Sequence, residues 1–206
     1  MATDLRQGLI LAARQFYHQG WMVGTAGNLS AKLPNNSFWI TASGKQKGKL
    51  TEMDFLRLSP QGELLETPNP ANRPSAETSI HQGIYSLFPE AQVCYHVHSI
   101  EANLVSNLFP GDHIPLPPLE MVKGFGIWEE QPQATMALFQ NHLEVSQIAA
   151  DILERFQQFP PQIPALLIRN HGVTVWGKSG SEAENLVELS EYIFRYLVAA
   201  HSLKLF

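Results

Sequence analysis

Apolar residues recur every three or four positions in four stretches of the chain, a spacing typical of amphipathic helices. These stretches are residues 4–19, 76–88, 135–159 and 182–203. The first stretch begins at Asp4, directly after Thr3. The first three stretches are followed by Gly20, Pro89 and Pro160, respectively. Hydroxyl and carboxyl side chains favour helix starts, whereas glycine and proline favour helix ends. The sequence therefore predicts four helices with these approximate boundaries.

Shorter apolar runs lie between the helical stretches and predict β-strands. They cover residues 29–33, 38–41, 54–59, 63–65, 91–99, 165–168 and 173–176. The third and fourth runs flank a Ser-Pro-Gln-Gly turn and predict a hairpin. Within residues 91–99, Cys94, His96 and His98 share one face, because alternate residues of a strand point to the same side. The order of elements predicts an α/β fold in which helices cover a mostly antiparallel sheet.

The composition is that of an acidic globular protein. The 206 residues are 44% hydrophobic, and neither an internal repeat nor a long linker divides them, so we expect one domain over residues 1–206. The formal charge of −5 argues against a nucleic-acid or anionic-membrane partner. The one cysteine, Cys94, cannot form an intrachain disulfide. Because we find no secretory leader and no apolar run that could span a bilayer, we expect a cytoplasmic protein.

Eight histidines stand out in the composition, and three of them are placed where they could meet. His96 and His98 share a strand face, where side chains roughly 6.5–7 Å apart can close on one metal ion. His171 follows another apolar strand, and the next residue, Gly172, permits a close approach of the backbone. Three neutral imidazoles with one open position are typical of a catalytic zinc site.

Each of these histidines also has a simpler interpretation. A His-x-His triplet arises by chance on strands with alternating polar residues, and a histidine in a turn can be satisfied by the backbone. Cys94 shares the face of His96 and could offer a thiolate, although a small buried strand residue is the favoured interpretation. For the remaining histidines we expect ordinary solvated or hydrogen-bonded side chains. These are His18, His81, His113, His142 and His201.

Two glutamates are candidates for acid–base catalysis. Glu77 lies near the start of the second predicted helix, where a carboxylate can equally serve to stabilise the helix dipole. Glu120 lies in the apolar loop of residues 117–124, a setting that suits a carboxyl group for proton transfer near neutral pH. The residues alone do not decide between a catalytic and a structural role for either one.

Two glycine-containing loops and the start of the second predicted helix offer the chemistry of a phosphate site. They supply backbone N–H groups, hydroxyls and the ammonium groups of Lys45 and Lys47. No P-loop or dinucleotide-binding motif is present, so the loops favour a small phosphorylated substrate over ATP or NAD. The predicted phosphate-binding residues are Gly27, Asn28, Ser43, Gly44 and Ser75.

Five short motifs, taken in their order along nearly the whole chain, resemble the class II (zinc) aldolase and ribulose-phosphate epimerase family. They are Gly27-Asn28-Leu29-Ser30, Thr41-Ala42-Ser43-Gly44, Pro74-Ser75-Ala76-Glu77, His96-Val97-His98 and Asn170-His171-Gly172. The resemblance implies a three-layer α/β/α sandwich around a central, mostly antiparallel sheet. It also implies one zinc ion held by His96, His98 and His171, and a homotetramer with sites between neighbouring subunits.

A sixth motif, Leu119-Glu120-Met121-Val122-Lys123-Gly124, makes the chain most similar to family members that remove water from a phosphorylated sugar. This resemblance implies that Glu120 is an acid/base in the reaction. In the aldolases of the family that role belongs to the position of Glu77, so the division of labour between the two glutamates stays open. The alternatives are an aldolase or 4-epimerase acting on another sugar phosphate, or a non-catalytic adducin-like module, in which degraded metal ligands would be expected.

Overall fold

The computed structural model describes residues 4–205 of the chain, so Thr3 lies outside the described residues. The helices are α1 (Leu5–His18), α2 (Thr78–Leu87), α3 (Ile100–Leu108), α4 (Val145–Gln158) and α5 (Gly180–Ser202). The strands are β1 (Asn28–Lys32), β2 (Phe38–Thr41), β3 (Phe55–Leu58), β4 (Leu64–Glu66), β5 (Val93–Val97), β6 (His113–Pro115), β7 (Thr135–Phe139), β8 (Ala165–Ile168) and β9 (Gly172–Gly177). Short 3-10 helices are η1 (Lys47–Lys49), η2 (Glu52–Asp54) and η3 (Glu120–Phe125).

The strands form one sheet in the order β4-β3-β2-β1-β5-β9-β8-β7-β6. All neighbouring strands are antiparallel except β7 and β8, which are parallel. The centre of the sheet pairs β5 with β1 on one side and with β9 on the other. This register places His96 opposite both Asn28 and Thr174. Strands that are far apart in the sequence therefore meet at the end of β5.

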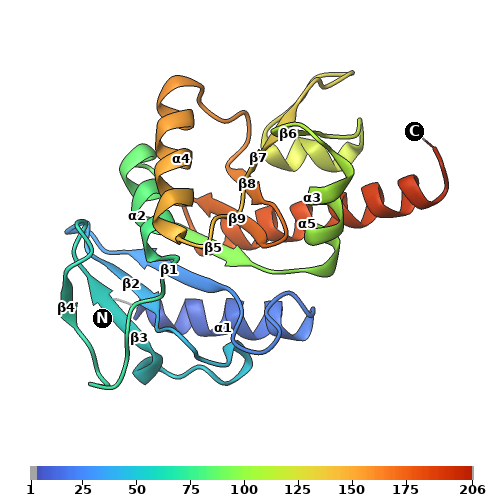
Figure 1. The fold of residues 1–206 in the computed structure, drawn as a ribbon. Helices are drawn as coiled ribbons and strands as arrows, with labels where there is room; N and C mark the ends of the chain where they lie inside the picture. The colour runs from blue at the N-terminus through green and yellow to red at the C-terminus, as the bar shows by residue number, and fades with distance from the viewer. Residues whose placement is uncertain (1–3, 206) are drawn as a thin grey trace.

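Helices cover both faces of the sheet (Figure 1). On one face, α1, α3 and α5 pack against alternate strand residues such as Tyr95 and Val97. On the other, α2 and α4 lie side by side and pack against Cys94 and Trp176. Because alternate residues of a strand point to opposite faces, the central strands are apolar on both sides. The prediction of an α/β/α sandwich around a mostly antiparallel sheet is confirmed.

The sequence predicted most of the elements but misassigned residues 135–139 and missed helix α3 and the edge strand β6. Residues 135–139, expected to begin a helix, form strand β7, and α4 begins only at Val145. The side chains of β7 are buried against both helical layers, and such a short apolar run has no period that separates a strand from a helix. Helix α3 was not predicted at all, because Ile100 and Leu104 are exposed and blur its apolar stripe. Ser99, expected to end the preceding strand, caps α3 by accepting a hydrogen bond from the Ala102 N–H.

Within residues 4–205, none of the helices combines the length and the apolar character that a membrane crossing requires. The longest, α5, has charged and polar residues along its exposed side and packs its apolar side on the sheet. Its place is therefore in the outer layer of the sandwich.

Candidate metal centre

Three imidazoles and one carboxylate converge at the end of β5. The Nε2 atoms of His96 and His98 are 2.8 Å apart. Glu77 Oε1 lies 2.8 Å from His171 Nε2, 3.6 Å from His96 Nε2 and 3.7 Å from His98 Nε2. All four ligand-type atoms lie within 4.8 Å of one another. The structure thus brings together the three histidines predicted to bind a metal and one of the two predicted catalytic glutamates.

Each histidine is aimed by its own strand or turn. His96 lies inside β5, and its Nδ1 is 2.9 Å from the Thr174 hydroxyl on β9, so Nε2 points to the cluster. Such a partner on the far ring nitrogen fixes the orientation of a ligating imidazole. His98 follows β5 directly, and its N–H donates to the Trp21 carbonyl at 2.8 Å. His171 lies in the turn between β8 and β9.

Gly172 makes the approach of His171 to His98 possible. A Cβ at this glycine would lie 2.2 Å from the Val97 carbonyl oxygen and 2.9 Å from Cδ2 of His98. Real side chains do not tolerate such contacts, so only glycine lets the β8–β9 turn come this close to the end of β5. The expectation that this glycine permits a close backbone approach is confirmed.

The electrostatics of the cluster favour an ionised Glu77 carboxylate beside a neutral His96 ring. Burial raises the pKa of Glu77, but the facing imidazoles of His96, His171 and His98 outweigh it and hold that pKa far below its usual range. Burial likewise keeps the pKa of His96 well below its ordinary value. Neutral imidazoles and ionised carboxylates are the forms that bind metal ions.

The donor set and its spacing fit a divalent metal ion. Tetrahedral zinc with ligands at 2.0–2.1 Å requires ligand atoms about 3.3 Å from one another. The four separations of 2.8–3.7 Å among His96, His98, Glu77 and His171 given above bracket this value, and all pairs lie within 4.8 Å. Three imidazole nitrogens with one oxygen are ligands that suit zinc and also other first-row divalent ions.

A cavity of about 300 Å³ lies beside the cluster, lined by Glu77 and His98. All the residues predicted to bind phosphate line it as well: Gly27, Asn28, Ser43, Gly44 and Ser75. Lys47 adds an ammonium group, whose Nζ donates to the carbonyls of Thr25 and Lys45 at 2.7 and 2.9 Å. Burial lowers the pKa of Lys47 to about 8, against the opposing effect of Glu77. The cavity therefore joins the metal-type ligands to a polar, glycine-rich wall.

Lys45 and Glu120, both expected to contribute to the site, are not among the residues that line this cavity. The Lys45 side chain, expected to add positive potential to this loop, is paired with Asp54 at 3.0 Å. Glu120, at the start of η3, is not among the residues that line the cavity, and its side chain is 82% exposed with Lys123 Nζ at 2.7 Å. The expectation of an apolar setting for Glu120 is wrong, because the apolar neighbours Val122 and Phe125 turn inward and leave this side chain at the surface.

Sequence reasoning gave no special role to His81, yet this residue is linked to the cluster. The ring is fully buried, and its Nε2 is hydrogen-bonded to Asn28, which in turn donates to Glu77. The available signal was the spacing of Glu77 and His81, four residues apart at the start of a helix, which puts them on one face. Cys94 is buried in β5 at the α2 and α4 face, as the favoured interpretation expected.

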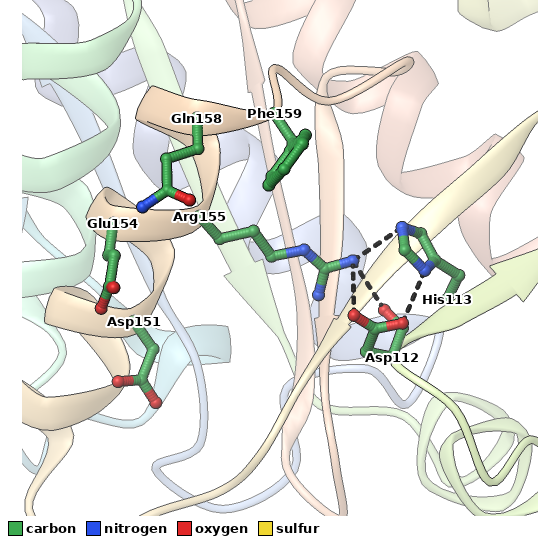
Figure 2. A pocket seen from close by; sticks show the side chains of 7 residues that line it. All are labelled: Asp112, His113, Asp151, Glu154, Arg155, Gln158 and Phe159. Atoms are coloured by element: carbon green, nitrogen blue, oxygen red, sulfur yellow. Dashed lines mark hydrogen bonds and ion pairs between the residues drawn. The ribbon is translucent and has the colours of Figure 1, made fainter.

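A second cavity, of about 500 Å³, lies between α4 and the edge strand β6 (Figure 2). Arg155 extends from α4 and donates to the Asp112 carbonyl at 2.9 Å and to His113 Nε2 at 2.8 Å. His113 Nδ1 lies 2.7 Å from the Asp112 carboxylate. These groups satisfy one another, so they fasten β6 to α4, and His113 is the hydrogen-bonded side chain that was expected.

Comparison with known proteins places this geometry in a family. Residues 7–198 match the class II aldolase and adducin N-terminal domain family. The chain belongs to this family. Methylthioribulose-1-phosphate dehydratase of Microcystis aeruginosa is 63% identical over 202 residues, which cover 98% of each chain. The protein of the same name from Leptospira biflexa is 43% identical, over 88% of this chain and 90% of its own.

Solved structures agree with the fold. YgbL of Escherichia coli superposes with a TM-score of 0.79 at 26% identity, covering 95% of this chain and 89% of its own. L-fuculose-1-phosphate aldolase from Thermus thermophilus gives a TM-score of 0.77 at 21% identity, covering 96% and 94%. The predicted family and the class II aldolase-like fold are confirmed, and the family together with the cluster of three histidines and Glu77 indicates a divalent metal.

Proposed function

We propose that this protein is a methylthioribulose-1-phosphate dehydratase, a hydro-lyase of methionine salvage. The observation that carries the proposal is 63% identity to a dehydratase of that name over 98% of both chains, together with an intact cluster of three histidines and Glu77. The reaction removes water from 5-methylthioribulose 1-phosphate to give 2,3-diketo-5-methylthiopentyl 1-phosphate. An intact ligand set argues against a non-catalytic module of the adducin kind.

In this proposal His96, His98 and His171 hold one zinc ion. Bound zinc supplies Lewis-acid polarisation of the substrate C2 carbonyl and makes the neighbouring C3 proton acidic. Glu77 Oε1 faces the three imidazoles and is ionised, so it can accept that proton. The wall formed by Gly27, Asn28, Ser43, Gly44 and Ser75, with Lys47, is proposed to bind the phosphate.

Loss of the C4 hydroxyl needs a proton to complete the water molecule, and we assign its delivery to Glu120. Its exposed position suits this role only if another copy of the chain covers it, and the family resemblance implies a homotetramer with sites between subunits. Exposed Ile100 and Leu104 on α3 and Tyr192 on the neighbouring α5 support such an association. A cytoplasmic location completes the proposal.

Product identification tests the function. The zinc-loaded protein is incubated separately with methylthioribulose 1-phosphate, fuculose 1-phosphate and ribulose 5-phosphate. We expect a product one water lighter from the first compound alone, detected by mass spectrometry. Carbon–carbon cleavage of fuculose 1-phosphate or epimerisation of ribulose 5-phosphate, without dehydration of the first compound, would replace the proposal by an aldolase or an epimerase.

Mixing two inactive variants tests the shared site. His98→Ala loses a metal ligand and Glu120→Gln loses the proposed acid, so each alone should be inactive. In tetramers assembled at random from equal amounts of both, roughly a quarter of the sites combine an intact cluster with an intact neighbouring Glu120. We expect about that fraction of wild-type activity in the mixture. No recovery would show that Glu120 does not act across subunits, and full activity of Glu120→Gln alone would remove it from the mechanism.

A further inference from the structure

Helix α2 and strand β1 present matching rows of polar side chains behind the metal centre. Glu77, His81 and Tyr85 are four residues apart and lie along one side of α2. Asn28 and Ser30 are two residues apart and share one face of β1. Four residues of helix rise about 6 Å and two residues of strand about 6.6 Å, so the rows stay in step. This match lets the side chains of the two elements interdigitate.

The two rows are joined in one hydrogen-bonded chain. Tyr85 Oη lies 2.7 Å from Ser30 Oγ, which lies 2.6 Å from His81 Nδ1. His81 Nε2 bonds to Asn28 Oδ1, and Asn28 Nδ2 bonds to Glu77 Oε2. His81 and Ser30 are fully buried and Asn28 is 2% exposed. The chain ends on the oxygen of Glu77 that faces away from the histidine cluster, and leaves Oε1 to the cluster.

The direction of this chain follows from its last member. The Asn28 amide nitrogen donates to Glu77 Oε2, so its carbonyl oxygen faces His81 Nε2. His81 must then donate from Nε2 and accept at Nδ1 from the Ser30 hydroxyl. Ser30 Oγ is also 3.5 Å from the Cys94 carbonyl, but the 2.6 Å contact to His81 is the shorter and stronger one. Burial lowers the pKa of His81 to about 4, which agrees with a neutral ring.

We propose that His81 is a positioning residue, which acts through Asn28 as a neutral imidazole with its proton on Nε2 to fix the Glu77 carboxylate against the metal centre. The catalytic part of this inference rests on the proposed function, whereas its structural part does not. An amide does not release an N–H proton near neutral pH, so Asn28 interrupts any proton path. The chain therefore orients Glu77 and does not deliver protons to it.

The tautomer can be observed directly. In full-length protein labelled with 15N-histidine at pH 7, two-bond 15N–1H correlation spectra distinguish a protonated ring nitrogen from a bare one, and the signals that vanish in His81→Gln identify His81. We expect Nε2 protonated and Nδ1 bare, with or without zinc. A proton on Nδ1, or on both nitrogens, would overturn the proposal whether or not the protein is a dehydratase.

Two amide variants test the role. The amide nitrogen of glutamine reaches roughly the place of Nε2, so His81→Gln keeps the donor to Asn28, whereas the shorter amide of His81→Asn reaches only the place of Nδ1. We expect His81→Asn to lower both zinc affinity and kcat by about 10- to 100-fold with little change in KM, and His81→Gln to stay within a few-fold of the wild type.

Both variants lose the same ring, so thermal melting of each serves as the control for folding. Zinc affinity, measured by competition with a chelator, is independent of any substrate and separates failure of this inference from failure of the proposed function. Equal zinc affinities of His81→Asn and His81→Gln would contradict a positioning role. If His81→Asn does not fold, the tautomer in the wild-type protein still decides the question.

Discussion

At the scale of single residues, the sequence identifies some side chains of the site and misses others. The strand alternation of His96 and His98, and the glycine after His171, mark the metal ligands because these features depend on local geometry. The spacing of Glu77 and His81 puts both on one face of α2, but it does not show their link through Asn28, because that link depends on how far α2 is shifted along β1. Glu120 was misplaced for a related reason: a run of apolar neighbours does not tell which side chain of a short helix turns outward.

Glu191 is an acidic residue that is fully buried outside the metal centre. It lies on α5 with no exposed surface, and neither carboxylate oxygen has a hydrogen-bond partner among residues 4–205. Burial raises the pKa of Glu191 to about 8, and Ser99 and Arg195 nearby offset this rise only in part. The folded protein therefore holds a proton here that the unfolded chain releases above its ordinary pKa of 4.5.

Glu191 should make stability fall as the pH rises. Below about pH 4.5 the carboxyl group is neutral in both states, and between pH 4.5 and 8 only the unfolded state ionises, so the free energy of unfolding decreases by a few kcal/mol. Glu191→Gln removes this loss, and we expect its advantage over wild type to grow from pH 5 to pH 8 in urea unfolding. Glu154→Gln, at an exposed site of α4, is the control. A pH-independent difference for Glu191→Gln would contradict the assignment.

At the scale of elements, the metal centre forms where the β8–β9 turn meets the end of β5. The sequence predicted some of the surrounding elements and missed others. Strands with clear borders, such as β2 and β8, were predicted to the residue, whereas β7 and α3 were not. The difference lies in burial: β7 is apolar on both faces, and α3 leaves Ile100 and Leu104 exposed. The spacing of apolar residues indicates which face of an element is buried. It therefore does not identify an element when both faces are buried or when the apolar face is exposed to solvent.

The β8–β9 turn provides a test of this packing. Gly172→Ala would place a methyl group 2.2 Å from the Val97 carbonyl oxygen, so the turn must move away from β5 and take His171 with it. We expect a loss of about 1–3 kcal/mol in the free energy of unfolding and weaker zinc binding, measured by urea unfolding and chelator competition. Gly111→Ala, where a Cβ meets nothing within 4 Å, is the matched control and should change neither. Wild-type zinc affinity in Gly172→Ala would contradict the dependence of the cluster on this approach.

At the scale of the whole molecule, a nine-stranded sheet brings residues separated by nearly a hundred positions to one point. Glu77 and His171 are far apart in the sequence, yet Glu77 Oε1 and His171 Nε2 are 2.8 Å apart. The sheet order could not be predicted from local patterns, because it depends on which strands pair. The family resemblance implied only the α/β/α sandwich with its mostly antiparallel sheet, which the structure confirms.

Under the proposed function, this site removes water from methylthioribulose 1-phosphate with one zinc ion per chain. The most direct measurement follows the rate of formation of the dehydrated product while zinc is added stepwise to metal-free protein. We predict no activity without metal, a rise in rate that is linear up to one equivalent per chain, and a plateau thereafter. Full activity in the metal-free protein, or no dehydrated product at saturating zinc, would contradict the proposed function.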